Sequence, residues 1–271
     1  MRGRVPPYFE LLIEGFKSGR AGRHVHLGYW DAPPPLSAPC SAEEFEAAQA
    51  RLNRIIIELA DIANGQRVLD VGCGFGGTLS AVNEAWRDMR MVGLNIDGRQ
   101  LGICRTITPQ PTNALALVAG DAGAIPLRPG TFDRVICLEA MFHFHSRAGF
   151  LRQAAEALRP GGRLALSDIL FRHPGAHAPI DIALLEEIIR REYGPWPQLW
   201  AGSSDIVDPA RAASLVLDRF VDATRATLPT YRMTAPGDVH TLSAQPSAGS
   251  LMRWLHGNGY LSYVCLAFHK M

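Results

Sequence analysis

The segment VLDVGCGFGG, from Val68 to Gly77, constrains the fold more than any other part of the chain. An apolar run typical of a buried strand passes directly into a turn that is rich in glycine. Because glycine has no Cβ atom, such a turn can adopt positive φ angles and lets the backbone approach a ligand closely. A helical pattern from Thr78 to Trp86 follows the turn. The segment therefore predicts a strand, a ligand-binding loop and a helix, the first unit of an α/β sheet.

Further units of the same kind follow along the chain. From Arg67 to Asp168, short apolar runs alternate with helical patterns, which is typical of βα units on a parallel sheet. Pro160 and the two glycines after it end the last helix before the fifth strand. The predicted strands span 67–72, 91–95, 114–121, 132–139 and 163–168, and the helices between them span 78–86, 98–107 and 150–158.

The remaining segments predict a cap and the closing part of the sheet. We expect an amphipathic helix within MRGRVPPYFELLIEGF, at the start of the chain. The second part of the cap contains the aromatic stretch PWPQLW. Helices are expected over 42–63, 180–193 and 248–256, and strands near 220–226 and 260–270. With no internal repeat, residues 1–271 are interpreted as one domain, with a core of about 42–172 and 203–271 and a cap of about 1–41 and 173–202.

The glycine loop by itself leaves two kinds of ligand open. Gly72, Gly74 and Gly77 also satisfy the GxGxxG spacing of dinucleotide-binding loops. Asp70 argues against a dinucleotide, because its carboxylate would repel a pyrophosphate and suits a ligand that carries an ammonium group. Where NAD enzymes place an acid for the ribose hydroxyls, after the second strand, this chain has Asn95.

An acid also follows the third predicted strand. Asp121, in GDAGAIPL, can accept a hydrogen bond from an adenine amino group. An ammonium-bearing ligand with an adenine ring describes S-adenosylmethionine (SAM) better than it describes NAD. The residues around the loop therefore favour SAM.

Four segments carry a resemblance to a known family. VLDVGCGFGG, GDAGAIPL, FDRVICLEAMFHF and LRPGGRLALSD look like the successive motifs of the class I SAM-dependent methyltransferases. More narrowly, they resemble bacterial natural-product enzymes such as sugar O-methyltransferases. The resemblance runs from about Gly22 to Asp168. It implies a Rossmann-like α/β fold with a seven-stranded, mostly parallel sheet, helices on both faces and a helical cap over the active site.

The resemblance also implies which residues contact the cofactor. Asn95 departs from the family pattern, in which an acid binds the ribose, but an amide can accept one hydrogen bond and donate another. In HLGYW, Tyr29 is expected near the cofactor carboxylate, and Trp30 is expected to shield the site from water. The implied contacts are Asp70, Gly72 and Gly74 at the methionine moiety, Asn95 with Ile96 at the ribose, Gln100 in the same cofactor-binding set, Asp121 and Ala122 at the adenine, and Glu139 closing the site.

Methyl transfer to a hydroxyl also requires a base, for which His143 is the candidate. It lies four residues beyond Glu139, past the carboxyl end of the fourth predicted strand, where ligands bind in open α/β sheets. Asp168 ends the fifth strand, next to the fourth, so we expect its carboxylate to orient the imidazole and raise its basicity. The resemblance places a histidine and an aspartate at these positions. His145 is the alternative base.

The expected acceptor is a small secondary metabolite held by the cap. Tyr193, Trp196, Trp200, Phe142 and Phe144 suggest an apolar or planar acceptor. The first alternative is C-methylation of a prenyl or aromatic carbon, where Glu139 would matter more than a base. The second is a SAM-type fold repurposed for cyclisation or as a binding module.

Composition and charge limit the kinds of partner that the chain is expected to bind. With 27 basic and 26 acidic side chains and no basic stripe, the chain does not fit a nucleic-acid binder. No apolar run reaches the length of about 20 residues that a membrane span needs. The five cysteines are scattered, without a CxxC pair, which fits reduced thiols in a cytoplasmic protein and no metal site. A homo-oligomer is compatible with the sequence.

Overall fold

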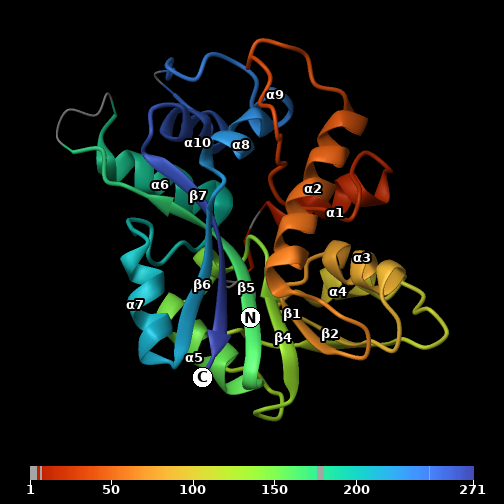
Figure 1. Cartoon of the computed structure of the whole chain (residues 1–271). Helices are drawn as coiled ribbons and strands as arrows, with labels where there is room; N and C mark the ends of the chain where they lie inside the picture. Colours follow the sequence, from red (N-terminus) through yellow and green to blue (C-terminus); the bar gives the residue numbers. More distant parts are fainter. Residues whose placement is uncertain (1–4, 7, 176–179, 244) are drawn as a thin grey trace.

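In the computed structural model, seven strands form one sheet within the described residues, which are 5–6, 8–175, 180–243 and 245–271 (Figure 1). The strand order is β3-β2-β1-β4-β5-β7-β6. The first five strands are parallel, and β7 runs antiparallel to both β5 and β6. This confirms the predicted Rossmann-like sheet. The strands are β1 (Arg67–Val71), β2 (Arg90–Asn95), β3 (Ala114–Ala119), β4 (Phe132–Cys137), β5 (Leu158–Phe171), β6 (Leu215–Asp222) and β7 (Leu261–Lys270).

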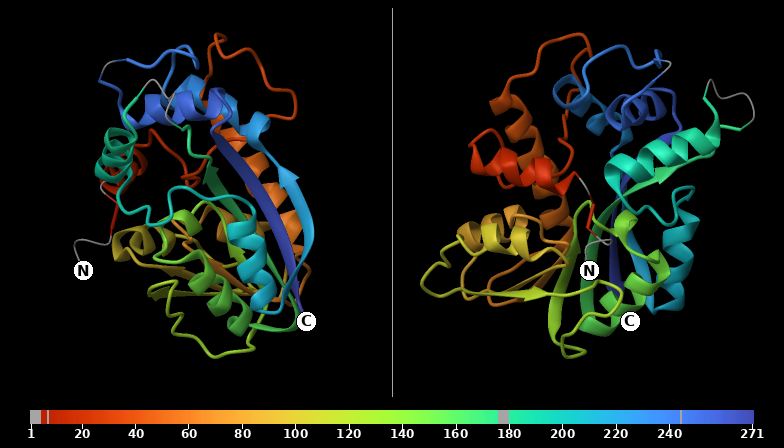
Figure 2. Two further views of the ribbon diagram at one scale, coloured as in Figure 1. Left: turned by 90° about the vertical axis from the view of Figure 1, so that its left-hand side faces the viewer. Right: turned by 180° about the vertical axis from the view of Figure 1, so that it is seen from behind.

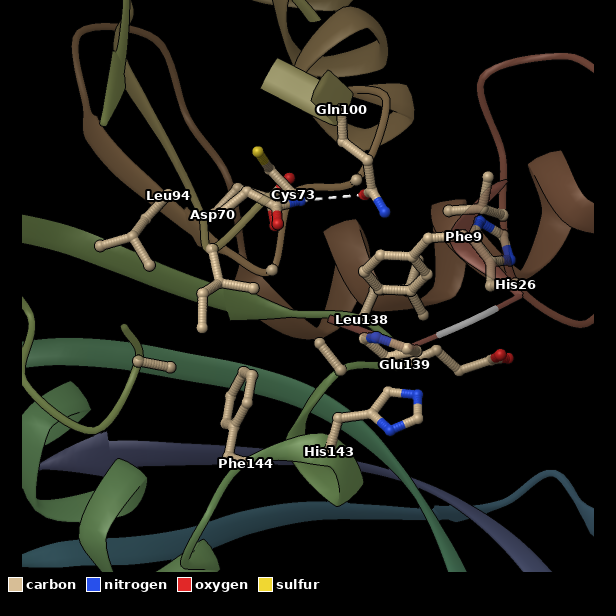
Figure 3. Close-up of a pocket in the computed structure, with 18 of the residues that line it drawn as sticks. Phe9, His26, Asp70, Cys73, Leu94, Gln100, Leu138, Glu139, His143 and Phe144 are labelled. Atoms are coloured by element: carbon tan, nitrogen blue, oxygen red, sulfur yellow. Dashed lines mark hydrogen bonds between the residues drawn. The ribbon is translucent and has the colours of Figure 1, made fainter. Parts of the chain in front are cut away.

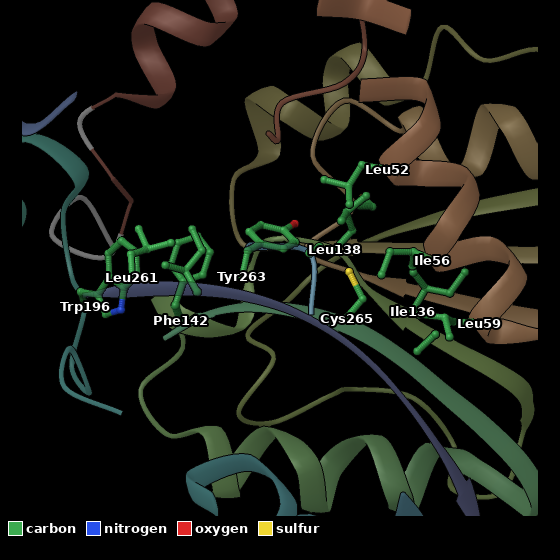
Figure 4. Close-up of a cluster of buried hydrophobic side chains, with 14 of the residues drawn as sticks. Leu52, Ile56, Leu59, Ile136, Leu138, Phe142, Trp196, Leu261, Tyr263 and Cys265 are labelled. Carbon is green, nitrogen blue, oxygen red and sulfur yellow. The ribbon is translucent and has the colours of Figure 1, made fainter. Parts of the chain in front are cut away.

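Helices cover both faces of the sheet, and each face has its own core. On one face, α2 (Ala42–Ala60) packs Leu52, Ile56 and Leu59 against Ile136 of β4 and the residues of β7 (Figure 4). The helices α3 (Gly77–Ala85) and α4 (Gly98–Cys104) lie on this same face. On the other face, α5 (Arg147–Ala157) and α7 (Ser204–Ala212) form the second apolar cluster. Alternation of side chains along each strand supplies both clusters.

Two strands differ from the prediction at their ends. β5 begins at Leu158, five residues earlier than expected, because Leu158 pairs with Phe132 before the ladder shifts register. β6 lies earlier than 220–226, because the chain leaves the sheet after Asp222 and Thr224 begins a new helix. The helix α7 was not predicted, since Pro209 interrupts its pattern.

The cap is larger than the sequence analysis predicts. At the carboxyl ends of the parallel strands lie α1 (Phe9–Lys17), α6 (Ile182–Tyr193), α8 (Thr224–Thr227), α9 (Tyr231–Thr234) and α10 (Ala248–Gly257) (Figures 1 and 2). The last three belong to the segment that we assigned to the core, yet α10 packs against α6. The predicted N-terminal helix is present as α1, with Ile13 buried against Phe75 and Ile103. Residues 1–4 and Pro7 of that prediction lie outside the described residues.

Candidate functional site

A cavity of about 530 Å³ opens where the parallel strands end, beneath the cap (Figure 3). Its floor is the glycine loop after β1, and its sides come from the ends of β2 and β4. α1 and the loop at 195–197 close it from the cap side. A volume of this size is typical of pockets for small molecules and cofactors. It contains most, but not all, of the predicted site residues.

The glycine loop takes the shape that its sequence predicts. Gly72 and Gly74 have φ angles of 76° and 53°, in the left-handed region that favours glycine. A Cβ atom on Gly72 would lie 2.4 Å from the Cβ of Ala140, so the position has no room for a side chain. The Gly72 amide donates to the Leu94 carbonyl at 2.8 Å, which ties the loop to β2. The loop is therefore a rigid floor on which a ligand can lie against bare backbone.

Asp70 lies at the end of β1 with an unsatisfied carboxyl group. Only 2% of its surface is exposed, and its Oδ2 atom has no hydrogen-bond partner among the described residues. Burial penalises the charged form and raises the pKa of this carboxyl to about 7. A buried polar group without a partner is destabilising unless a ligand satisfies it. The position therefore fits a ligand that brings a positive charge or hydrogen-bond donors, as the amino acid end of SAM does.

Asn95 and Gln100 form a second polar pair in the cavity. The Asn95 side chain donates to Gln100 Oε1 at 3.0 Å and accepts from the amide of Asp97 at 3.0 Å. Gln100 Nε2 is buried and has no partner among the described residues. Asn95 thus holds Gln100, whose free amide N–H groups fit the oxygen atoms of a ribose. Ile96, which is 40% exposed, lines the cavity beside them.

Asp121 and Ala122 line the cavity just after β3. The Asp121 Oδ1 atom accepts a hydrogen bond from the amide of Gly123 at 2.8 Å, which fixes the carboxyl group. Ala122 is buried, so it offers an apolar contact rather than a polar one. This combination suits the edge and face of a flat heterocycle, and their role at the adenine stays a prediction.

Glu139 lies where the cavity floor meets the cap, in a strained backbone conformation with φ of 49°. Its amide donates to Ser167 Oγ at 2.9 Å. Its Oε1 atom accepts from the Leu27 amide and from the Tyr263 hydroxyl, both at 2.8 Å. Burial raises the pKa of this carboxyl to about 7. Strain that is held by this many contacts is typical of functional positions.

His143 ends a short 3-10 helix, Met141–His143, and lines the cavity (Figure 3). Its Nδ1 atom lies 2.9 Å from the Pro195 carbonyl. A carbonyl only accepts, so Nδ1 carries the proton in the neutral ring and Nε2 keeps its lone pair. The Tyr8 hydroxyl lies 3.0 Å from that Nε2 atom and donates to it. Burial lowers the pKa of His143 to about 4, so the imidazole is neutral at pH 7.

The predicted contact between His143 and Asp168 is wrong. Asp168 is fully buried, and its Oδ2 atom accepts from Arg147 Nε at 2.6 Å in a buried ion pair. Arg147 also donates to the carbonyls of Gln198 and Ile169. Asp168 therefore anchors α5 and the 195–200 loop rather than orienting the imidazole. The Pro195 carbonyl holds His143 instead, and His145 lies exposed at the cavity.

The predicted roles of Tyr29 and Trp30 are also wrong. Tyr29 lies outside the cavity lining and faces a separate surface hollow near Ile55 and Arg219. Trp30 is buried, stacks on Phe45 and donates to Glu44. The chain contacts the cavity just before HLGYW and at its first residue, rather than at Tyr29 and Trp30. His24, Val25 and His26 line the cavity in their place.

The aromatic residues of the cap are mostly core. Phe142 and Trp196 stack on each other at 4.2 Å and are both buried (Figure 4). Trp200 donates to Glu186 in the cap. Of the five predicted aromatic residues, only Phe144 belongs to the cavity lining. The cap does line the cavity, as expected, but through residues that the sequence analysis did not name: Tyr8, Phe9 and Leu12 at the start of α1, and Pro195 and Pro197. The apolar face of the predicted N-terminal helix was the available signal.

Among the residues that the structure describes, no group of three or more His, Cys, Asp or Glu side chains is placed to hold a metal ion. None of the described helices combines the length and the apolar character that a bilayer crossing requires.

Comparison with known proteins supports the family and the fold. The sequence pattern of the family described as "Methyltransferase domain" matches residues 69–166. The chain is 33% identical over 180 residues to erythromycin 3''-O-methyltransferase of Saccharopolyspora erythraea, covering 65% of this chain and 56% of that protein. It is 31% identical over 168 residues to the O-methyltransferase rstn1 of Aspergillus nomiae, covering 61% and 71%. The match thus spans little more than half the length of the first relative.

A solved structure shows the fold over the whole chain. The mycolic acid cyclopropane synthase CmaA1, solved with S-adenosylhomocysteine (SAH) and CTAB, superposes with a TM-score of 0.77 at 18% identity, covering 98% of this chain and 97% of that one. The glycine loop, the strand order and the sequence matches all point to the same family. The chain belongs to the family of SAM-dependent methyltransferases.

Proposed function

We propose that this chain transfers the methyl group of SAM to a hydroxyl of an uncharged small molecule, a secondary metabolite, with His143 as the base. The observation that carries the proposal is the fixed tautomer of His143. Its Nδ1–H points at the Pro195 carbonyl, so the basic Nε2 atom faces the cavity. The O-methyltransferase names of the relatives support acceptors of this chemistry.

The residues present fit SAM as the cofactor. When bound, SAM supplies a methyl group on a positively charged sulfur, which a nucleophile can displace in line. Asp70 and Glu139 lie in the cavity as carboxyl groups for the positive end, and Gln100 offers free N–H groups for the ribose. Asp121 and Ala122 offer the adenine contacts. The chain's main task is to hold the two reactants in line, which can supply on the order of 7–11 kcal/mol at best.

The contact of Tyr8 with His143 supports the placement of an acceptor hydroxyl at the same ring nitrogen. Its hydroxyl donates to His143 Nε2 at 3.0 Å, within the reach required for proton transfer. An acceptor hydroxyl in the place of the Tyr8 hydroxyl gives up its proton to Nε2. Since burial keeps His143 neutral at pH 7, the lone pair is available before the acceptor binds. The Pro195 carbonyl keeps the ring in the required orientation throughout.

The charge of the lining supports an uncharged acceptor. Among the described lining residues, Arg23 is the single side chain with a permanent positive charge, and it donates to the carbonyls of Phe75 and Ile103. A phosphate or diphosphate on the acceptor would therefore meet no free cation there. The apolar residues Phe9, Leu12 and Phe144 suit an apolar or planar body. Nucleic acid does not fit this chemistry.

Glu139 favours a second candidate function, methyl transfer to carbon or a cyclisation. Its carboxyl group lies in the cavity with Tyr8, Phe9 and Phe144, an arrangement that can stabilise a positive charge developing on an acceptor. In that case the reaction depends on Glu139 and not on a base. His143 would then be needed only for packing.

The experiment compares His143→Asn, His145→Asn and Glu139→Gln with the wild-type protein. Asparagine can still donate to the Pro195 carbonyl but has no basic nitrogen. Each protein is incubated with methyl-labelled SAM and a small-molecule extract, and label is located in the products by mass spectrometry. We expect label on a hydroxyl and a loss of about 100-fold or more in His143→Asn. SAH affinity, measured by calorimetry, should be unchanged in that variant.

The other outcomes separate the alternatives. Label on carbon, with His143→Asn active and Glu139→Gln inactive, refutes the hydroxyl proposal and supports the second candidate. Loss in His145→Asn alone moves the base to that residue. No binding of SAH to the wild-type protein refutes the proposed function as a whole.

We further propose that residues 1–271 act as one methyltransferase domain with its cap and that it works in the cytoplasm. All five cysteines are free, and four of them are buried, as is usual for proteins of a reducing compartment. Whether the domain forms a homo-oligomer is tested by light scattering.

A further inference from the structure

Two histidines lie in the cavity without a role in the proposed chemistry. His24 and His26 belong to the segment that crosses the glycine loop, and both line the cavity. The His24 ring lies directly on Gly77, the first residue of α3, where an added Cβ atom would come within 2.6 Å of His24 Nδ1. Figure 3 shows the His26 ring and the Asp70 carboxyl on different sides of the cavity. The histidines and the acid thus give the cavity two chemically distinct sides.

Hydrogen bonds fix the tautomers of the pair. His26 Nδ1 lies 2.8 Å from the Leu27 carbonyl, so it carries a proton and donates. His26 Nε2 then has the lone pair, and it accepts from His24 Nδ1 at 3.2 Å. In its neutral form, His24 therefore has no proton on Nε2, which makes no hydrogen bond to the described residues. Only a second proton turns that atom into a donor.

The backbone around the pair is held in place from α2. Gln49 is 7% exposed and donates to the carbonyls of both His24 and His26, at 3.1 and 2.7 Å. The two rings are therefore placed by the fold rather than by a mobile loop. The amino end of α3 beneath them adds a positive partial charge. A fixed histidine pair over a helix start is suited to an anion once His24 takes up a second proton and becomes a donor.

SAM carries one anionic group, its carboxylate. We propose that His24, supported by His26, receives this carboxylate and takes up a proton as it does so. The inference rests on the proposed function in one respect, that the cofactor is SAM. The ammonium group of the same amino acid moiety then lies toward the Asp70 side. The prediction of Tyr29 for the carboxylate is replaced by a residue that the structure places in the cavity.

The surroundings explain why the proton arrives with the ligand. Burial lowers the pKa of His24, and it lowers that of His26 to about 3, which favours the neutral form of both rings in the ligand-free protein. Glu46 of α2 acts to raise the pKa of His24, and the His26 ring lies 5.0 Å from the His24 ring. The guanidinium of the preceding residue, Arg23, donates to the carbonyls of Phe75 and Ile103. A carboxylate in contact with Nε2 adds an opposite charge at close range, which favours the protonated ring.

The test is calorimetry with two ligands that differ only in the carboxylate. They are SAH and its decarboxylated analogue, 5′-deoxy-5′-(3-aminopropylthio)adenosine, each titrated in two buffers of different ionisation enthalpy at pH 7.5. Asp70 and Glu139 also exchange protons near this pH, but both ligands carry the amine, so that contribution cancels in the difference. Wild type, His24→Asn and His240→Asn are compared; His240 is an exposed histidine outside the cavity.

We expect the wild type and His240→Asn to take up more protons with SAH than with the analogue, by up to about one proton. His24→Asn should remove that difference and weaken SAH by about tenfold, since one charge-assisted hydrogen bond is lost. Its affinity for the analogue should stay unchanged. Equal proton uptake for both ligands, or equal weakening of both by His24→Asn, overturns the assignment. Absence of any binding by the wild type refutes the proposed function instead.

Discussion

Replacing Asp70 with asparagine should stabilise the ligand-free protein while it weakens cofactor binding. The carboxyl is 2% exposed, and its Oδ2 atom has no partner among the described residues. Burial raises its pKa from 3.8 to about 7. A carboxyl whose pKa is higher in the folded state binds its proton more tightly there, so the folded protein loses stability as the pH rises from the unfolded pKa to the folded one.

The size of the effect follows from the shift. Each pKa unit corresponds to 1.36 kcal/mol, so about three units give a penalty of about 4 kcal/mol above pH 7. At pH 5 the folded carboxyl is still protonated, and the penalty is only roughly 1 to 2 kcal/mol. Asparagine has no such titration. The stability of Asp70→Asn relative to wild type should therefore grow by roughly 2 to 3 kcal/mol between pH 5 and pH 8.

Urea unfolding of both proteins at pH 5 and pH 8 measures this difference directly. The neighbouring carboxyl of Glu139 titrates in both proteins, so it drops out of the comparison. Addition of SAH at pH 8 should raise the melting temperature of wild type more than that of the variant. A stability difference that does not change with pH would refute the reasoning, because it would show that Asp70 does not titrate abnormally.

Two further predictions concern the buried ion pair next to the site and the glycine loop. Arg147→Met should destabilise the protein by about 3–5 kcal/mol in urea unfolding, because Asp168 is then buried without its partner. The double variant with Asp168→Leu should recover most of that loss, and a double variant as unstable as the single one would contradict the explanation. Gly72→Ala should lose about 1–3 kcal/mol more than Gly65→Ala, and should also weaken SAH binding. Both glycines have left-handed φ angles, 76° and 79°, but only Gly72 faces Ala140 within 4 Å. Equal losses in the two variants would show that crowding at Gly72 does not matter.

Local patterns in the sequence predict the sheet and the cofactor loop well. The strand β1, the glycine turn and the start of α3 lie within a dozen residues, so chain connectivity alone places Asp70 beside the loop. The alternation of apolar runs with helical patterns predicts parallel strands, because each connecting helix carries the chain back to the end of the sheet where the preceding strand began. The ends of elements are less well predicted, as β5 and β6 show.

The partners of the catalytic candidates depended on the tertiary structure. His143 and Asp168 do follow neighbouring strands, yet Asp168 pairs with Arg147 and His143 pairs with the Pro195 carbonyl. Those partners come from α5 and from a loop of the cap, which no local pattern places relative to the strand ends.

For the lining of the cavity, too, some features follow from the sequence alone and others depend on how the cap packs. The sequence by itself determined the succession of βα units along the chain, the glycine loop, Asp70 and the position of His143 after β4. Only the tertiary structure decided that His24 and Tyr8 enter the cavity while Tyr29 and Trp196 do not. The physical reason is that side chains close to each other in the sequence share the same local pattern. Which of them faces the ligand depends on how the cap packs against the sheet, through contacts between segments far apart in the chain.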